Sequence, residues 1–147
     1  MQNVLFIPGN TPSSKNSRQS MTLETKPYQD KKGRTKTWKN VNIPSKLTST
    51  FKKESLSYFI QQRPQWLAMK RGLEYPLMVE FTFIRDSKRK FDLINMAQII
   101  QDMMVDVGWV EDVNYTVITP YFGEVRIDKE NPGCEIRIIN NVNKEYL

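Results

Sequence analysis

The sequence predicts a single α+β domain in which a mixed β-sheet packs against two main helices. A chain of 147 residues has the usual length of one domain. Its apolar fraction of 39% and aromatic fraction of 11% are enough for a packed core. Strand patterns come first, followed by a helix, a strand, a second helix and further strands, which is the order of an α+β fold. No repeat or linker divides the chain, so residues 1–147 are expected to form one domain.

The N-terminal part of the chain predicts a strand followed by a hairpin. Residues 3–7 (NVLFI) are an apolar run closed by Pro8 and Gly9, which is typical of a strand end. Residues 9–20 are rich in Gly, Pro, Ser and Asn and predict a loop. Residues 21–43, around the turn sequence DKKG, predict an exposed hairpin with a basic tip. Its cations are Lys31, Lys32, Arg34, Lys36 and Lys39. They fit either a solvated hairpin face or an arm that contacts phosphates.

A helix is expected to start after Pro44, with Ser45 as its N-cap. Pro64 should interrupt or end this helix, because proline lacks the backbone donor that a helix interior needs. A second helical turn through Trp66 should then close at Gly72.

The middle of the chain combines the strongest strand with the best-defined helix. Residues 77–84 (LMVEFTFI) alternate in the period of a strand and run directly into the basic sequence RDSKRK. Asp92 then predicts an N-cap, and Gly108 marks the end of the helix. The core-facing arc of this helix consists of Leu93, Met96, Ala97, Ile100, Met103, Met104 and Val107. Ile94 is apolar but lies on the opposite, polar side.

Three more strands are expected after this helix. They cover residues 113–122, 124–127 and, after the turn sequence DKENPG, 134–139. Cys134 in the last of them is the single cysteine, which excludes a disulfide within the chain and a cysteine-ligated zinc. We expect its side chain to be a buried or half-buried small hydrophobe.

Composition also limits the chemistry. The chain has no histidine, which excludes Ser-His-Asp triads, Cys-His dyads and histidine-based nuclease or zinc sites. The net charge of +6 favours a polyanionic partner, most often a nucleic acid. No apolar run approaches the roughly 18 residues of a membrane span, and no signal peptide is recognisable. We therefore expect a cytoplasmic protein without a membrane partner.

The chemistry is expected where the basic sequence meets Asp92. A helix N-terminus attracts anions, so Asp92 fits a structural cap, but it also fits a metal ligand beside cations that hold phosphate. Without histidine, phosphodiester cleavage generally depends on Mg²⁺ held by carboxylates. Glu111 and Asp112 follow the helix and supply further acids. The expected helix is about 22 Å long, and Asp112 follows its far end. Asp112 therefore reaches Asp92 only if the chain doubles straight back along the helix. Otherwise the second acid comes from a partner chain.

Two stretches resemble a known family. Residues 11–18 (TPSSKNSR) are similar to the Pro-Pro-Ser-Asn-Asn element of the RusA family of Holliday junction resolvases. Residues 90–114 are similar to its basic turn, Asp-x-Asp-Asn helix start, mid-helix Asp and later Asp-Asp pair. Asp92 and Asn95 stand at the first Asp and the Asn of the helix start, and Asp112 at the first Asp of the pair. Ile94 stands where the family has the second Asp of the helix start, and Val113 stands where it has the second Asp of the later pair.

The resemblance implies a RusA-like fold and a homodimer that resolves four-way DNA junctions with Mg²⁺ as cofactor, or with Mn²⁺ as its substitute. It implies Asp92 and Asp112 as metal ligands, with Glu111 and Asn95 as further catalytic residues. The expected nucleic-acid-binding residues are Lys15, Asn16, Arg18, Arg85, Lys88, Arg89 and Lys90. Because Ile94 and Val113 replace two carboxylates, a protein of this fold that binds branched DNA without cutting it is the alternative. An unrelated small basic protein, such as an RNA-binding module, is the third.

Overall fold

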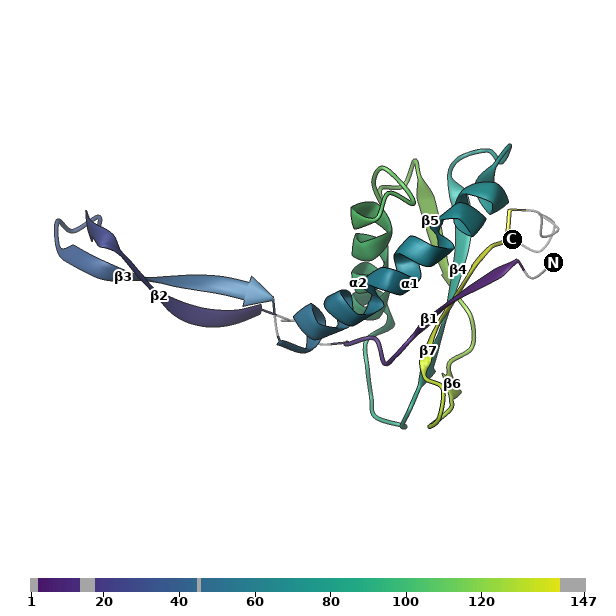
Figure 1. Ribbon diagram of the computed structural model, residues 1–147, viewed down its shortest axis with the longest axis horizontal. Helices are drawn as coiled ribbons and strands as arrows, with labels where there is room; N and C mark the ends of the chain where they lie inside the picture. Colours follow the sequence, from purple (N-terminus) through teal and green to yellow (C-terminus); the bar gives the residue numbers. More distant parts are fainter. Residues whose placement is uncertain (1–2, 14–17, 45, 141–147) are drawn as a thin grey trace.

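The computed structural model describes residues 3–13, 18–44 and 46–140, and it contains the expected mixed sheet (Figure 1). The sheet order is β1-β7-β4-β5, and the short strand β6 pairs with the end of β4. Strand β7 runs antiparallel to both β1 and β4, whereas β5 and β6 run parallel to β4. The strand bounds are β1 Val4–Pro8, β4 Leu77–Arg85, β5 Ile118–Phe122, β6 Arg126–Ile127 and β7 Gly133–Ile138. The α+β prediction is confirmed.

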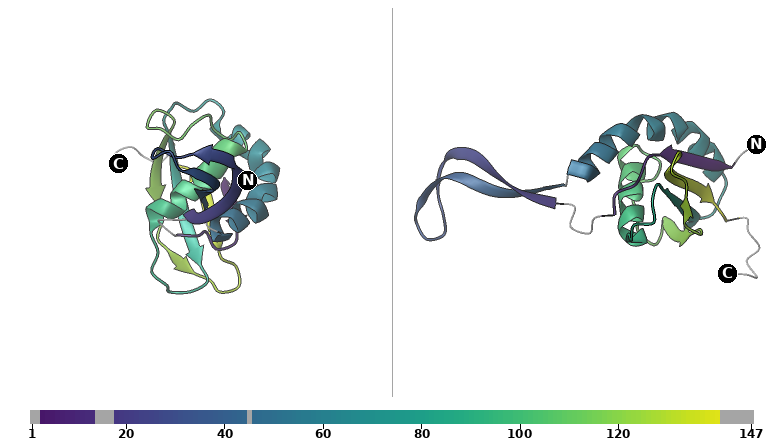
Figure 2. Two further views of the ribbon diagram at one scale, coloured as in Figure 1. Left: turned by 90° about the vertical axis from the view of Figure 1, so that its left-hand side faces the viewer. Right: turned by 90° about the horizontal axis from the view of Figure 1, so that it is seen from below.

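Helices α1 (Lys46–Lys70) and α2 (Leu93–Asp106) lie on one face of this sheet (Figure 2). The side chains of the central strand β4 point alternately to the two faces of the sheet, as predicted. Val79, Phe81 and Phe83 are fully buried towards the helices. On the other face Met78, Glu80 and Thr82 are half-buried, whereas Ile84 is buried. Glu80 forms an ion pair there with Arg137 of β7 at 3.7 Å.

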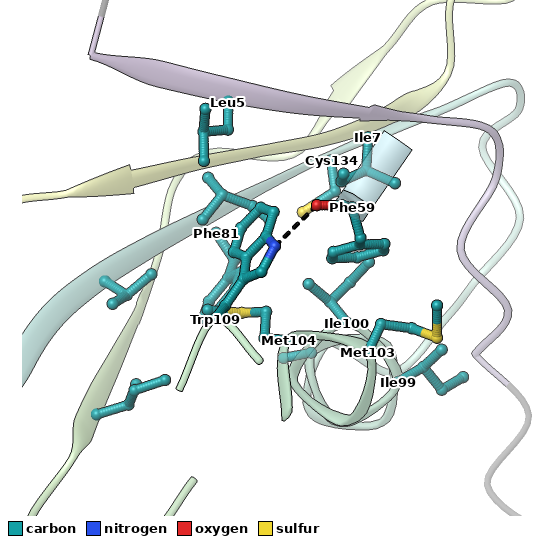
Figure 3. Close-up of a cluster of buried hydrophobic side chains, with 14 of the residues drawn as sticks. Leu5, Ile7, Phe59, Phe81, Ile99, Ile100, Met103, Met104, Trp109 and Cys134 are labelled. Carbon is teal, nitrogen blue, oxygen red and sulfur yellow. Dashed lines mark hydrogen bonds between the residues drawn. The ribbon is translucent and has the colours of Figure 1, made fainter. Parts of the chain in front are cut away.

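Two tryptophans connect the helices in the core. The Trp66 side chain of α1 donates a hydrogen bond to the carbonyl of Trp109 at 2.9 Å. The Trp109 side chain donates one to the carbonyl of Phe59, also at 2.9 Å (Figure 3). All three side chains are fully buried, so these bonds satisfy polar groups that water does not reach. Cys134 is buried beside them, as predicted, and burial raises the pKa of its thiol well above the ordinary value.

Helix α1 continues through Pro64 without a break, which contradicts the expected interruption. Long-range contacts on both sides of the proline account for the continuity. Arg63 donates to the carbonyl of Gly108 at 3.1 Å, and Trp66 anchors the next turn to Trp109. Pro64 itself is exposed, so the carbonyl that loses its helical donor lies on the solvent side. The predicted N-cap, Ser45, lies outside the described residues.

The prediction for α2 is largely confirmed. Asp92 caps the helix, and Gly108 follows its last turn with φ of 80°. Of the predicted core arc, Leu93 and Val107 are only half-buried, and Ile99 is buried in addition. Ile94 is 71% exposed, as its position among polar residues predicted.

The strand expected from residue 113 begins only at Ile118. Side-chain hydrogen bonds explain the delay. The Asn114 side chain accepts from the backbone of Thr116 at 2.9 Å, and that of Asp112 accepts from the backbone of Val113 at 2.8 Å. Asn and Asp commonly hold turns in this way, so these residues form a turn in place of a strand.

The predicted hairpin is a separate two-stranded sheet of β2 (Arg18–Gln29) and β3 (Thr35–Pro44). We call it the arm. It projects away from the remainder of the protein as a twisted ribbon (Figure 1). Side chains are described for its residues 24–37, which include the tip.

Candidate functional site

The loop from β4 to α2 carries a group of exposed cations. Lys88, Arg89 and Lys90 are all exposed and come shortly before α2, separated from its first residue by Phe91 and the N-cap Asp92. Their charges add to the positive end of the helix dipole, so this end of the protein favours anions. We call residues 88–90 the basic loop.

Arg85 differs from these three cations because it is engaged within the protein. Its guanidinium donates to the carbonyl of Thr11 at 2.6 Å and lies 4.9 Å above the ring of Phe91. Burial lowers the pKa of Arg85 from its ordinary value, while Asp86 opposes this shift. Among the described residues its Nε atom is buried without a hydrogen-bond partner. Arg85 therefore ties the start of the loop to the segment after β1.

Asp92 uses one carboxylate oxygen to cap α2. Its Oδ1 atom accepts from the backbone N–H groups of Ile94 at 2.9 Å and Asn95 at 3.3 Å. The side chain is exposed, and Oδ2 has no partner within the part of the chain that the structure describes. Because one oxygen is free, the cap and a metal-ligand role are compatible. The amide nitrogen of Asn95, one turn away, is buried and also lacks a partner among the described residues.

Glu111 and Asp112 lie at the opposite end of α2. The preceding carbonyl, of Trp109, accepts from Lys70 at 3.0 Å, and the following Val117 carbonyl accepts from Leu77 at the start of β4 at 2.8 Å. The chain therefore passes from the end of α2 to the start of β4, whereas Asp92 follows the end of β4. Glu111 lines a pocket of about 340 Å³ together with Lys70, Tyr75, Val110, Thr116 and Val117.

Asp112 is exposed, and local hydrogen bonds fix its carboxylate. Oδ2 accepts from the Asn114 side chain at 2.9 Å, and Oδ1 accepts from the backbone of Val113 at 2.8 Å. These bonds, that of Asn114 first, lower the pKa of Asp112 below its usual value. The group is therefore ionised throughout the neutral range, as a metal ligand must be.

Within one chain the structure does not bring Asp92 and Asp112 together. They flank the 14 residues of α2, a length of about 20 Å, and the chain does not double back. The described residues contain no group of three or more His, Cys, Asp or Glu side chains that could hold a metal ion. Of the two arrangements that the sequence allowed, only the one with a partner chain remains for a shared metal.

The other predicted residues have varied positions. Lys15 and Asn16 lie outside the described residues, and of Arg18 only the backbone, at the start of β2, is described. Lys70 and Tyr75 beside Glu111 were not predicted. Lys70 is the last residue of α1 and gives no local signal, because its role depends on the distant Trp109 carbonyl.

Comparison with protein-family models and with curated protein sequences finds no match for this chain. In the described residues no helix is both long and apolar enough to cross a membrane. The functional interpretation therefore rests on the side chains at the two ends of α2.

Proposed function

We propose that the protein is a homodimeric, Mg²⁺-dependent endonuclease that binds and cuts branched DNA, as RusA-like resolvases do at four-way junctions. One observation carries the proposal: three exposed cations and, after Phe91, Asp92 lie together at a helix N-terminus, and one Asp92 carboxylate oxygen has no partner among the described residues. Cations adjacent to a carboxylate fit a site in which a phosphate and a metal ion are neighbours.

The residues at this end of α2 fit the chemistry of such a site. The free Oδ2 of Asp92 supplies one of the one or two carboxylates that Mg²⁺ usually takes from a protein. Mg²⁺ would activate water and reduce the negative charge of the scissile phosphate. The basic loop would hold the neighbouring phosphates. The amide nitrogen of Asn95, buried and without a partner in the described part of the chain, is a donor within one helical turn of Asp92.

A second chain would supply the missing carboxylate. In a two-fold dimer every contact occurs twice, so Asp92 of each chain would meet Asp112 and Glu111 of the other. Two antiparallel α2 helices would create this arrangement, because the N-terminus of each would lie beside the C-terminus of its partner. The outward stripe of α2 has the required helical spacing and consists of Ile94, Gln98, Gln101 and Val105. Ile94, 71% exposed, would be covered by such a contact.

The test is cleavage of a labelled synthetic four-way junction with and without Mg²⁺, using the wild type and Asp92→Asn. We expect paired, symmetric nicks that require both the metal and Asp92. Asn preserves the cap of α2, so loss of cleavage in this variant would report the charge and not the fold. Nicking by Asp92→Asn at the wild-type rate would refute the role of Asp92.

The second candidate is a protein of the same type that binds branched DNA without cutting it. Ile94 and Val113 favour it, because each stands where the RusA pattern has a carboxylate. This candidate predicts tight junction binding that weakens steeply with salt, ignores Mg²⁺ and yields no nicks in Mg²⁺ or Mn²⁺.

A further inference from the structure

The arm carries most of the protein's net charge. Residues 18–44 contain seven of the 22 Lys and Arg residues but only two of the 16 Asp and Glu residues. The arm therefore has a net charge of +5 out of the total of +6, and the remaining residues together have +1. A charge so unevenly distributed creates a strong local field at the arm, which favours a polyanion there.

The acidic side chains of the arm do not neutralise all of its cations. Asp30 pairs with Arg34 at 3.1 Å and Lys36 at 3.6 Å, while its Oδ1 accepts from two backbone N–H groups of the turn. Lys26, Lys31 and Lys32 are exposed and have no ion pair among the described side chains. Asp30 thus shapes the tip and leaves these three lysines available.

The shape of the arm is that of an isolated ribbon. Its strands pair only with each other among the described residues, and it extends well beyond the sheet and helices (Figure 2). A bulge between Glu24 and Tyr28, where Pro27 lacks a backbone donor, bends the ribbon and increases its twist. An isolated two-stranded hairpin is only marginally stable in water, so its length does not serve the stability of the core.

We propose that the arm lies along double-stranded DNA and provides a phosphate-binding surface separate from the basic loop. The 12 residues of β2 span roughly 36 Å, which is about one turn of B-DNA. A two-stranded ribbon is also one of the elements that the major groove, about 12 Å wide, admits. Lys26 on the strand and Lys31 and Lys32 at the tip then contact successive phosphates. The inference takes its DNA partner from the proposed function but requires no cleavage.

The test measures binding to a labelled 30-base-pair DNA duplex over a range of NaCl concentrations. The arm variant is Lys31→Gln with Lys32→Gln. The matched control is Lys53→Gln with Arg71→Gln. It also removes two exposed positive charges, one within α1 and one directly after it. Each phosphate contact contributes about 0.9 to the slope of log K against log salt. We expect the arm variant to lose about 1.8 from the magnitude of this slope and the control to keep it.

The outcomes separate this inference from the proposed function. Equal slopes for the arm variant and the wild type would overturn the role of the arm, even if junction cleavage remained normal. Equal losses in both variants would mean a general effect of net charge and would also overturn it. A wild type that binds no duplex at any salt concentration would overturn the inference about the arm, whereas the proposed function is tested separately on the four-way junction. Thermal unfolding of both variants checks that the fold is intact.

Discussion

At the scale of single residues, Asp92 combines a structural role with a proposed chemical one. Because Oδ1 accepts from two N–H groups of α2, Asp92→Ala should cost about 1 kcal/mol and lower the melting temperature by a few degrees. Asp92→Asn should stay within a few tenths of a kcal/mol, because its side-chain oxygen still caps the helix. Thermal denaturation of both variants measures this difference. Equal destabilisation by Asn and Ala would show that the charge, and not the hydrogen bonds, stabilises the helix.

Ile94 offers the complementary test, the addition of a carboxylate. Its side chain is 71% exposed in the first turn of α2, where an acid interacts favourably with the helix dipole. Ile94→Asp should therefore fold normally, place a second carboxylate two residues from Asp92 and increase Mg²⁺-dependent cleavage at least tenfold. Gln98→Asp, exposed one turn further along, is the matched control and should not increase cleavage. Equal rates for both variants and the wild type would exclude a metal site at this helix end.

At the scale of elements, the chain between β5 and β6 runs along the edge of β4 at very close range. Gly123 donates to the carbonyl of Phe81 at 3.0 Å, and a Cβ atom at this glycine would overlap with Oγ1 of Thr82. We expect Gly123→Ala to destabilise the fold by about 1–3 kcal/mol. Thr82→Ala removes the overlapping oxygen and leaves Cβ at 3.2 Å, so the double variant should recover part of this loss. Chemical denaturation measures the coupling, and strictly additive effects would contradict the close packing.

The individual helices and strands show how much of the fold the sequence predicted. Strand β4 and helix α2 were predicted because their signals are local: alternation in β4, and a cap, an apolar arc and a terminal glycine in α2. The path of α1 was not, because its passage through Pro64 depends on contacts with Gly108 and Trp109, more than 40 residues away. The start of β5 was not predicted either, because the β-branched residues before Ile118 favour a strand, whereas the Asn114 side chain holds a turn there.

The candidate site was predictable only in part, for the same reason. The cations of the basic loop and the cap by Asp92 follow from adjacent residues, and both were identified. The separation of Asp92 from Asp112 follows from the direction of the chain after Gly108. Burial of Trp109 under α1 sets that direction. The number of residues after Gly108 limits only how far the chain can reach, and not the direction it takes.

At the scale of the whole molecule, the decisive question is whether two chains share each metal site. Asp92→Asn and Asp112→Asn should each abolish cleavage as pure proteins. After mixing and subunit exchange, a heterodimer would pair the intact Asp92 of one chain with the intact Asp112 of the other at one of its two sites. The second site would lack both carboxylates. We therefore expect the mixture to regain activity but to introduce single nicks in place of paired ones. Native gels of the labelled junction distinguish the two, because only paired nicks separate the junction into two duplexes.

A site within a single chain cannot give this result, because every chain in the mixture would lack one of the two carboxylates. Absence of recovery, with subunit exchange verified by differently tagged chains, would exclude the shared site. Monomeric behaviour of the wild type at micromolar concentration in sedimentation would exclude it independently. Recovery would explain how the fold keeps Asp92 and Asp112 at opposite ends of a helix about 20 Å long and still forms a site from them. The two-fold axis that creates two such sites also matches the approximate two-fold symmetry of a four-way junction, so one geometry would account for assembly and for paired cleavage.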